Sequence, residues 1–190
     1  PNTGGMGAYC PAPLGTMALR EQVTKQVLYP AVEALSRMGC PFQGVLYAGL
    51  MIVKGIPYVL EFNARMGDPE TQAVLPLLKT DLLEVIEAVV EHRLDQLAVE
   101  WHDETAVCVV MTSEGYPGPY QTGRAIHGLP SVPDATTVVF HAGTARTGAE
   151  VVTAGGRVLG ITGLGKTLSV AQAEAYRVTR SIAFAGAHYR

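Results

Sequence analysis

The sequence predicts an α+β fold in which a small β-rich unit with a terminal helix follows a mixed first half. Three observations predict it: apolar residues recur at helical spacing over residues 16–38, two apolar runs flank Lys54-Gly55, and short apolar runs beyond residue 104 separate loops rich in glycine and proline. With 48% hydrophobic and 16% charged residues, the 190-residue chain has the composition of a folded globular protein.

Charge and cysteine content argue against several classes of protein. The formal net charge of −3 gives no reason to expect non-specific attraction to nucleic acid or anionic lipid. The longest strongly apolar stretch, residues 45–53, contains a glycine and is far shorter than the roughly 20 residues of a membrane helix. Cys10, Cys40 and Cys108 form no CxxC pair, which argues against a disulfide framework and a zinc site. We therefore expect a cytoplasmic protein with neither nucleic acid nor membrane as a partner.

The first predicted element is a helix over residues 16–38. Its apolar positions follow helical spacing, and Gly39 suits the position just after a helix end. Pro30 lies inside this stretch, and proline lacks the backbone N–H that a helix interior uses. We therefore expect a kink or two shorter helices there.

A β-hairpin is predicted next, because residues 45–53 and 56–63 are two apolar runs on either side of a glycine turn at Lys54-Gly55. Beyond a polar stretch at 96–104 the chain is again β-rich. Its apolar runs predict strands at residues 106–111, 138–141, 151–153 and 157–159. Since glycines supply the positive φ of two-residue turns, Gly155-Gly156 predicts that the last two strands form a hairpin.

Two more helices are predicted from capping sequences. Asp81 and Glu84 resemble a capping box at the start of a helix that ends near Arg93. Ser169 and Gln172 resemble a second box, which begins the terminal helix.

Glu61 and Asn63 are the first candidates for chemistry. Alternate residues of a strand lie on one face, so these two side chains point the same way about 7 Å apart along the chain. A carboxylate and an amide oxygen suit a hard cation such as Mg²⁺, which completes its shell with water and phosphate oxygens. The alternative is a strand end with two solvated polar side chains, and a motif this short fits both.

The charged loop after this strand, residues 64–71, carries the next candidates. Arg65 can hold a phosphoryl or carboxylate group through two parallel hydrogen bonds, and Asp68 and Glu70 can receive an amine. A surface ion pair between Arg65 and Asp68 explains the same spacing equally well.

The segment Gly4, Gly5, Met6 and Gly7 also has two interpretations. Because its three glycines lack β-carbons, their backbone N–H groups can approach an anion closely, or the segment can be a flexible turn. The five histidines show no metal-ligand spacing, so a histidine metal cluster is not expected. Cys10 would need an activating base or a lowered pKa to act as a nucleophile, and we interpret it as a small buried residue.

Five longer segments carry a resemblance to a known family. They are PNTGGMGAYCPAP at 1–13, GVLYAGLM at 44–51, EFNARMGDPETQ at 61–72, VFHAGTA at 139–145 and GGRVLGIT at 155–162. In order and spacing they resemble the glycinamide ribonucleotide synthetase family, the phosphoribosylamine–glycine ligases, over essentially the whole chain.

The resemblance implies that residues 1–100 are the C-terminal part of an ATP-grasp catalytic domain and that residues 101–190 are the family's small β-rich C-terminal domain. Family chains are considerably longer, and their N-terminal domain, their lysine-bearing ATP-binding subdomain and their basic tail have no counterpart here. We therefore expect this chain to be a fragment that is inactive on its own.

The activity implied is that of an ATP-dependent ligase of de novo purine biosynthesis, which joins glycine to 5-phosphoribosylamine through a glycyl phosphate, with ATP and Mg²⁺ or Mn²⁺. The resemblance assigns the metal to Glu61 and Asn63 and the transferring phosphoryl group to Arg65. It assigns substrate binding to Gly4, Gly5, Met6, Gly7, Asp68 and Glu70. One departure is that the strand at 46–50 has no carboxylate, whereas many ATP-grasp enzymes carry a further acidic ligand there.

Two other functions stay open. A non-catalytic ATP-grasp remnant would keep the fold as a binding or assembly module, although such a module has no need of a metal-ligand pair beside an arginine. An ATP-grasp ligase with another acid or amine is disfavoured by the segments at 139–145 and 155–162, which resemble the glycinamide ribonucleotide synthetase family.

Overall fold

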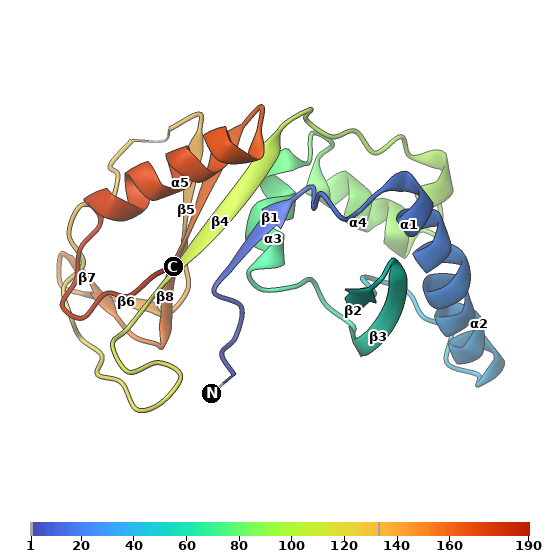
Figure 1. The fold of residues 1–190 in the computed structure, drawn as a ribbon, viewed down its shortest axis with the longest axis horizontal. Coiled ribbons are helices and arrows are strands. Elements are labelled where there is room, and N and C mark those ends of the chain that lie inside the picture. Colours follow the sequence, from blue (N-terminus) through green and yellow to red (C-terminus); the bar gives the residue numbers. More distant parts are fainter. Residues whose placement is uncertain (1, 133) are drawn as a thin grey trace. The chain divides into compact units, whose positions relative to one another are not determined.

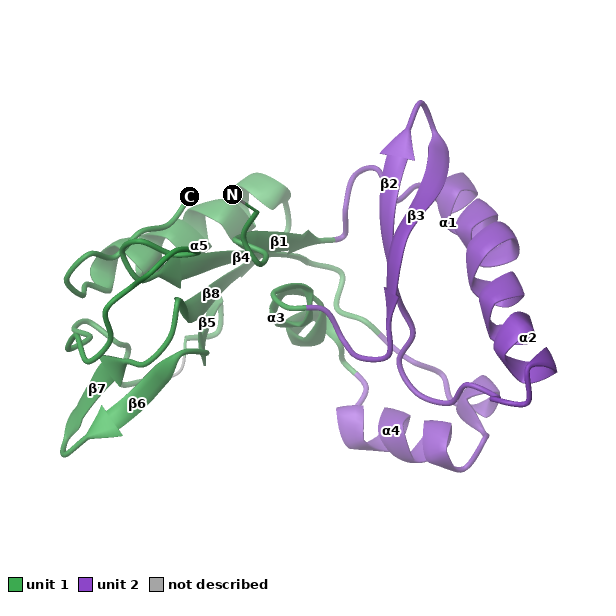
Figure 2. Cartoon of the chain, turned by 90° about the horizontal axis from the view of Figure 1, so that it is seen from below, with its two compact units in different colours: residues 1–10, 68–79, 101–190 green, residues 11–67, 80–100 purple. Residues whose placement is uncertain are grey.

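A computed structural model of the chain describes residues 2–132 and 134–190, which divide into two compact units. The first, here called the sheet unit, comprises residues 1–10, 68–79 and 101–190, and the second, the hairpin unit, comprises residues 11–67 and 80–100 (Figure 2). Compact units and family domains are different divisions of a chain, so the expected domain boundary near residue 100 stays a prediction.

The sheet unit is built on four antiparallel strands with a long helix on one face (Figure 1). In their order across the sheet, the strands are β1 (Gly7–Cys10), β4 (Thr105–Thr112), β8 (Arg157–Gly165) and β5 (Thr137–His141). Helix α5 (Leu168–Ser181) is the predicted terminal helix, and its residues Ala171, Ala175 and Val178 are buried. Its N-cap is Thr167, whose hydroxyl accepts from the Val170 N–H at 3.3 Å, so the expected cap at Ser169 is wrong by two residues.

Both faces of this sheet are covered, and successive residues of β4 contribute to the two faces in turn. Met111 belongs to the core cluster under α5, together with Leu159 and Ile161 of β8. Val110 belongs to a second cluster with Ala73, on the face covered by the short helix α3 (Glu70–Val74) and the 3₁₀ turn η2 (Leu75–Leu77). Neither β1 nor α3 was predicted.

The expected hairpin between residues 151–153 and 157–159 is wrong. Strand β7 (Glu150–Thr153) pairs with β6 (Thr144–Thr147), whereas β8 pairs with β4 and β5. The two glycines between β7 and β8 allow close packing instead: a Cβ on Gly155 would lie 3.0 Å from the Gly143 Cα, and one on Gly156 would lie 2.3 Å from Tyr116 Cδ2.

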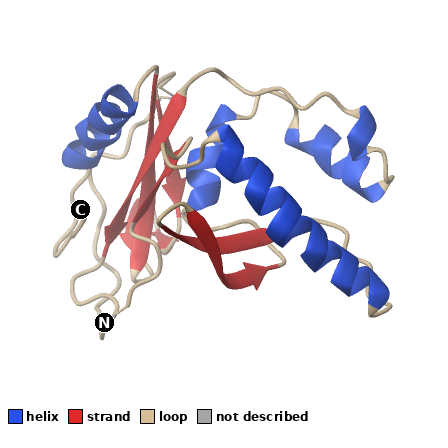
Figure 3. Cartoon of the chain, turned by 45° about the vertical axis from the view of Figure 1, so that its right-hand side comes forward, coloured by secondary structure: helices blue, strands red, loops and turns tan. Residues whose placement is uncertain are grey.

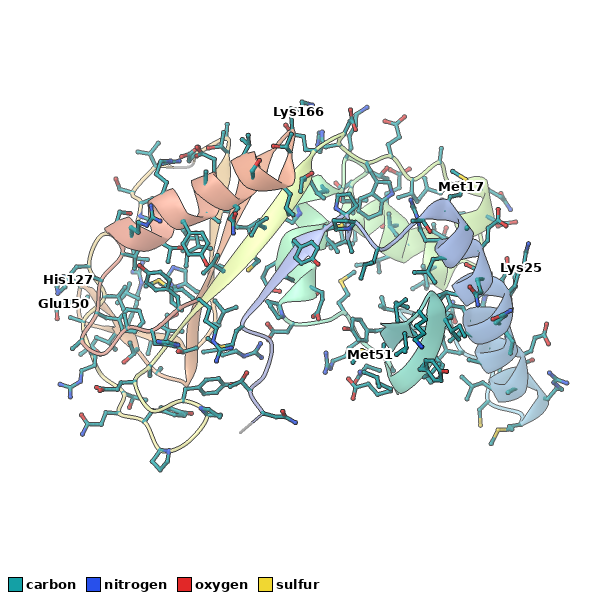
Figure 4. The ribbon with its side chains drawn as sticks, in the orientation of Figure 1. Met17, Lys25, Met51, His127, Glu150 and Lys166 are labelled. Atoms are coloured by element: carbon teal, nitrogen blue, oxygen red, sulfur yellow. The ribbon has the colours of Figure 1, made fainter. Side chains whose placement is uncertain are left out.

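The hairpin unit begins with one long helical segment (Figure 3). It consists of α1 (Met17–Val23), a π-helical turn η1 (Thr24–Leu28) and α2 (Tyr29–Arg37), close to the predicted span. Figure 4 labels the exposed Met17 and Lys25 on this segment. In the wide turn the Tyr29 N–H donates to the Thr24 carbonyl, immediately before Pro30. The structure therefore accommodates the proline by widening one turn without a non-helical break between the two helices.

Strands β2 (Tyr47–Val53) and β3 (Ile56–Asn63) form the predicted hairpin. Lys54 and Gly55 both have positive φ, 51° and 81°, as a type I′ turn requires. Gly49 pairs with Glu61 but Leu50 pairs with Val59, so Leu60 is the extra residue of a β-bulge.

Helix α4 (Leu82–Val90) begins where the capping sequence predicted, with the Asp81 carboxylate accepting from the Leu83 N–H at 2.8 Å. It ends at Val90, just before His92 adopts a left-handed φ of 56°, and the 3₁₀ turn η3 (Leu94–Gln96) follows. In the part of the chain that is described, no helix has the length and apolar character of a membrane span.

Candidate active site

The predicted metal-ligand pair lies at the end of β3. Glu61 and Asn63 share a face, as strand periodicity requires, and the Asn63 amide nitrogen donates to Glu61 Oε1 at 2.9 Å. Opposite them on β2, Gly49 pairs with Glu61 and Tyr47 pairs with Asn63. A Cβ at Gly49 would lie 3.1 Å from Glu61 Cγ, so the missing side chain leaves room for the carboxylate.

The donor set of this pair fits a small divalent cation. A carboxylate and an amide oxygen are hard ligands, and Mg²⁺ in phosphoryl-transfer sites takes one or two protein carboxylates together with phosphate oxygens and water. Among residues 2–132 and 134–190 there is no group of three or more His, Cys, Asp or Glu side chains placed to hold a metal ion. A cation on Glu61 and Asn63 would thus take its remaining ligands from a nucleotide and from water.

Arg65 follows β3 by two residues, in the same unit as the pair. Its Nη1 donates to the neighbouring Met66 carbonyl at 2.9 Å, and its side chain is exposed. The structure therefore places a guanidinium on the segment that leaves β3, the strand with the predicted metal-ligand pair.

Asp68 belongs to the sheet unit, where its carboxylate pairs with Arg157. Two parallel hydrogen bonds join them, from Nη1 to Oδ1 at 3.1 Å and from Nη2 to Oδ2 at 2.8 Å. The Gln72 amide donates to Oδ1 at 3.0 Å. Sequence reasoning missed Arg157 as a partner, although it lies in the segment at 155–162 that contributed to the resemblance, because 89 residues separate it from Asp68.

Each glycine of the segment at 4–7 lies so close to a neighbouring group that a side chain would not fit there. A Cβ on Gly4 would lie 2.9 Å from the Tyr116 hydroxyl oxygen, one on Gly5 2.3 Å from Pro69 Cδ, and one on Gly7 2.8 Å from the Cys108 carbonyl. The Gly4 N–H donates to the Tyr116 hydroxyl at 3.0 Å. That one donor is already engaged within the protein, and an anion-binding role for the other backbone groups stays a prediction.

The structure thus gathers the predicted site residues into two groups. Glu61, Asn63 and Arg65 lie in the hairpin unit, and the other predicted residues lie in the sheet unit. The second group consists of Gly4, Gly5, Met6, Gly7, Asp68 and Glu70, with Glu70 in the first turn of α3. The roles expected for both groups stay predictions.

Two of the three cysteines, Cys10 and Cys108, are not activated as nucleophiles. Burial raises the pKa of the half-buried Cys10 thiol, and it raises the pKa of the buried Cys108 thiol to about 11. A thiol must be deprotonated to attack, so neither group is prepared for covalent catalysis at neutral pH.

Two separate parts of the chain match protein families. Residues 1–71 match the family described as phosphoribosylglycinamide synthetase, ATP-grasp (A) domain, and residues 106–190 match phosphoribosylglycinamide synthetase, C domain. The first match contains Glu61 and Asn63, the predicted metal-ligand pair, and the second contains Arg157.

Comparison with individual proteins gives the same result. The phosphoribosylamine–glycine ligase of Synechocystis is 54% identical over all of this chain and 46% of its own length, and that of Caldanaerobacter subterraneus is 51% identical over 100% and 45%. A crystal structure of phosphoribosylamine–glycine ligase from Thermotoga maritima matches with a TM-score of 0.83 and 35% identity, over 100% of this chain and 46% of that one. The chain therefore spans just under half the length of the relatives it matches.

Proposed function

The chain belongs to the phosphoribosylglycinamide synthetase family, and from this premise we propose that it is the C-terminal portion of a phosphoribosylamine–glycine ligase. In this proposal residues 1–100 complete the ATP-grasp catalytic domain and residues 101–190 form the C-terminal domain. The observation that carries it is the pair of Glu61 and Asn63, joined at 2.9 Å on one face of β3 within the part that matches the ATP-grasp domain.

The proposed reaction activates a carboxylate. The γ-phosphoryl group of ATP passes to a carboxylate oxygen of glycine, which gives glycyl phosphate and ADP. The amine of 5-phosphoribosylamine then attacks the glycyl carbonyl carbon, inorganic phosphate leaves and the amine loses a proton, which gives glycinamide ribonucleotide. Phosphorylation is required because an unmodified carboxylate oxygen is a poor leaving group. No covalent enzyme nucleophile is needed, in agreement with the raised pKa values of Cys10 and Cys108.

Glu61 and Asn63 would hold Mg²⁺ or Mn²⁺ in this reaction. When bound, the metal neutralises charge on the phosphate oxygens as the phosphoryl group is transferred. Arg65, on the same segment, would place a guanidinium beside the transferring group or the acyl phosphate, where fixed positive charge favours the transition state. Asp68, Glu70 and the glycine segment at 4–7 would bind the two substrates. Because all three cysteines are free thiols, we also propose a reducing compartment, the cytoplasm.

The experiment uses a hybrid enzyme in which these 190 residues replace the matching segment of the Synechocystis ligase. We expect the hybrid to release ADP and to form glycinamide ribonucleotide only when glycine and phosphoribosylamine, generated in place, are both present. The unmodified Synechocystis enzyme is the positive control. A hybrid that folds and binds ATP but forms no product would contradict the proposal and favour a non-catalytic remnant.

A further inference from the structure

Arg157, the first residue of β8, touches two segments that lie far from it in sequence. Besides its two bonds to the Asp68 carboxylate, its Nη1 donates to the Asp68 carbonyl at 3.1 Å and lies 3.3 Å from the Gly5 carbonyl. The Arg157 side chain is 24% exposed. One guanidinium therefore connects the glycine segment to the segment that begins at Asp68.

The geometry of this contact is specific to arginine. Its planar fork matches a carboxylate with two parallel bonds from two nitrogens, whereas the ammonium of a lysine is a single point donor without this fork. The Gln72 amide donates to the same Asp68 carboxylate at 3.0 Å, so that group is held from two sides. Such a contact fixes orientation as well as distance.

Tyr116 holds the glycine segment from a second position. Its hydroxyl accepts from the Gly4 N–H at 3.0 Å, and its ring occupies the space left by the missing side chain of Gly156. A Cβ on Gly4 would lie 3.2 Å from Arg157 Cζ, so the segment passes close over the guanidinium. The residues that fix this segment therefore come from the part of the chain that matches the C domain.

We propose that Arg157 is a positioning residue of the ligase, which holds the segments at 4–7 and 68–70 in the arrangement that binds glycine and phosphoribosylamine. It acts through Asp68 and Gly5, since the donors described above are directed at protein acceptors. This inference rests on the proposed function, because the two segments include the residues expected to bind the substrates.

The test compares Arg157→Met and Arg157→Lys in the hybrid enzyme. Displacing a binding segment by about 1 Å lowers catalytic efficiency on the order of 100-fold. We expect Arg157→Met to raise KM for glycine or phosphoribosylamine by about 10-fold to 100-fold and to leave KM for ATP within about twofold. Arg157→Lys should recover only part of this loss, because lysine lacks the fork.

Hydrogen exchange of the backbone amides supplies a readout that does not depend on activity. In Arg157→Met we expect faster exchange at residues 4–6, 68 and 70–72 and unchanged exchange in β4 and β8. The matched control is Arg177→Met, which removes an arginine that pairs with Asp134 at 2.7 Å and Glu174 at 2.8 Å on the same unit. The control should keep all three KM values and the exchange of both segments.

Either of two results would overturn the inference. One is unchanged exchange and unchanged KM values in Arg157→Met. The other is an Arg157→Lys variant that is indistinguishable from the unsubstituted hybrid. If the unsubstituted hybrid forms no product, the proposed function fails, and hydrogen exchange still decides whether Arg157 holds the two segments.

Discussion

The carboxylate of Asp134, in the sheet unit, accepts three hydrogen bonds. It accepts from the backbone N–H and from the hydroxyl of Thr136, each at 2.8 Å, and from the Arg177 guanidinium at 2.7 Å. These donors, the backbone N–H of Thr136 first, hold the pKa of Asp134 well below its usual value. Arg177 likewise lowers the pKa of Glu174, so this exposed network favours ionised carboxylates.

We predict that this network makes the stability of the sheet unit depend on pH. Because the folded pKa of Asp134 is depressed, its contribution is present above the unfolded value of about 3.9 and is lost as pH falls toward the folded value. The Tm of the hybrid should therefore exceed that of Asp134→Asn at pH 6, and the difference should shrink below about pH 4.

Thermal unfolding across this pH range checks the prediction. Glu150→Gln is the control, since Glu150 lies at the start of β7 in the same unit (Figure 4). A difference between the unsubstituted hybrid and Asp134→Asn that stays constant down to pH 2.5 would show that the ionised carboxylate is not its source.

Strand periodicity was sufficient to predict the geometry of one part of the candidate site. It placed Glu61 and Asn63 on one face, and the hydrogen bond between them confirms that geometry. The partner of Asp68 was beyond such reasoning. Arg65 and Arg157 both carry a guanidinium suited to its carboxylate, and only the fold brings Arg157 to it.

Helix α5 and strand β8 meet at Gly163 of β8. A Cβ on Gly163 would lie 2.2 Å from the Ala171 carbonyl oxygen and 2.3 Å from the Ala175 backbone nitrogen. These neighbours are helix backbone and cannot rotate away. The small residues Ala171 and Ala175, both fully buried, allow the same close approach from the helix side.

We predict that Gly163→Ala destabilises the sheet unit by about 3 kcal/mol or more, because the helix must move away from the sheet. The comparison is Gly148→Ala in the turn between β6 and β7, where a Cβ meets nothing within 4 Å but φ is +63°. That strain costs roughly 1 kcal/mol. Urea unfolding of both variants measures the difference, and equal losses would contradict the close contact between α5 and β8.

Elements with a local signal were predicted, including β4, β5, β7 and β8 from their apolar runs, whereas the pairing between distant strands was not. The helical segment from α1 to α2, the hairpin of β2 and β3, and helix α4 each follow from residues within the element: apolar spacing, turn residues and a cap, respectively. Strand β1 has four residues, and it becomes a strand by pairing with β4 about a hundred residues later. The partner of β7 was predicted wrongly because a glycine pair that permits close packing cannot be distinguished in sequence from one that forms a turn.

Three stretches of the chain that are separate in sequence build the sheet unit. Residues 1–10 and 68–79 belong to it together with the part that follows residue 100, so neither apolar spacing nor composition predicts this arrangement. The resemblance of five segments did predict the family, and apolar spacing and turn patterns predicted the α+β fold class; the comparisons confirm the family and the matching fold. The resemblance succeeded because long segments retain specific information that three-residue motifs lack.

Glycine-dependent ADP release by the hybrid enzyme that carries Glu61→Ala tests whether this chain supplies the metal site. If Glu61 and Asn63 hold the metal that assists phosphoryl transfer, ADP release should fall by about 100-fold or more, because the metal contributes several kcal/mol of charge stabilisation. The hybrid with Glu150→Ala should keep its full rate. A Glu61→Ala hybrid that releases ADP as fast as the unsubstituted hybrid would contradict the claim that this chain supplies the metal site of the ligase.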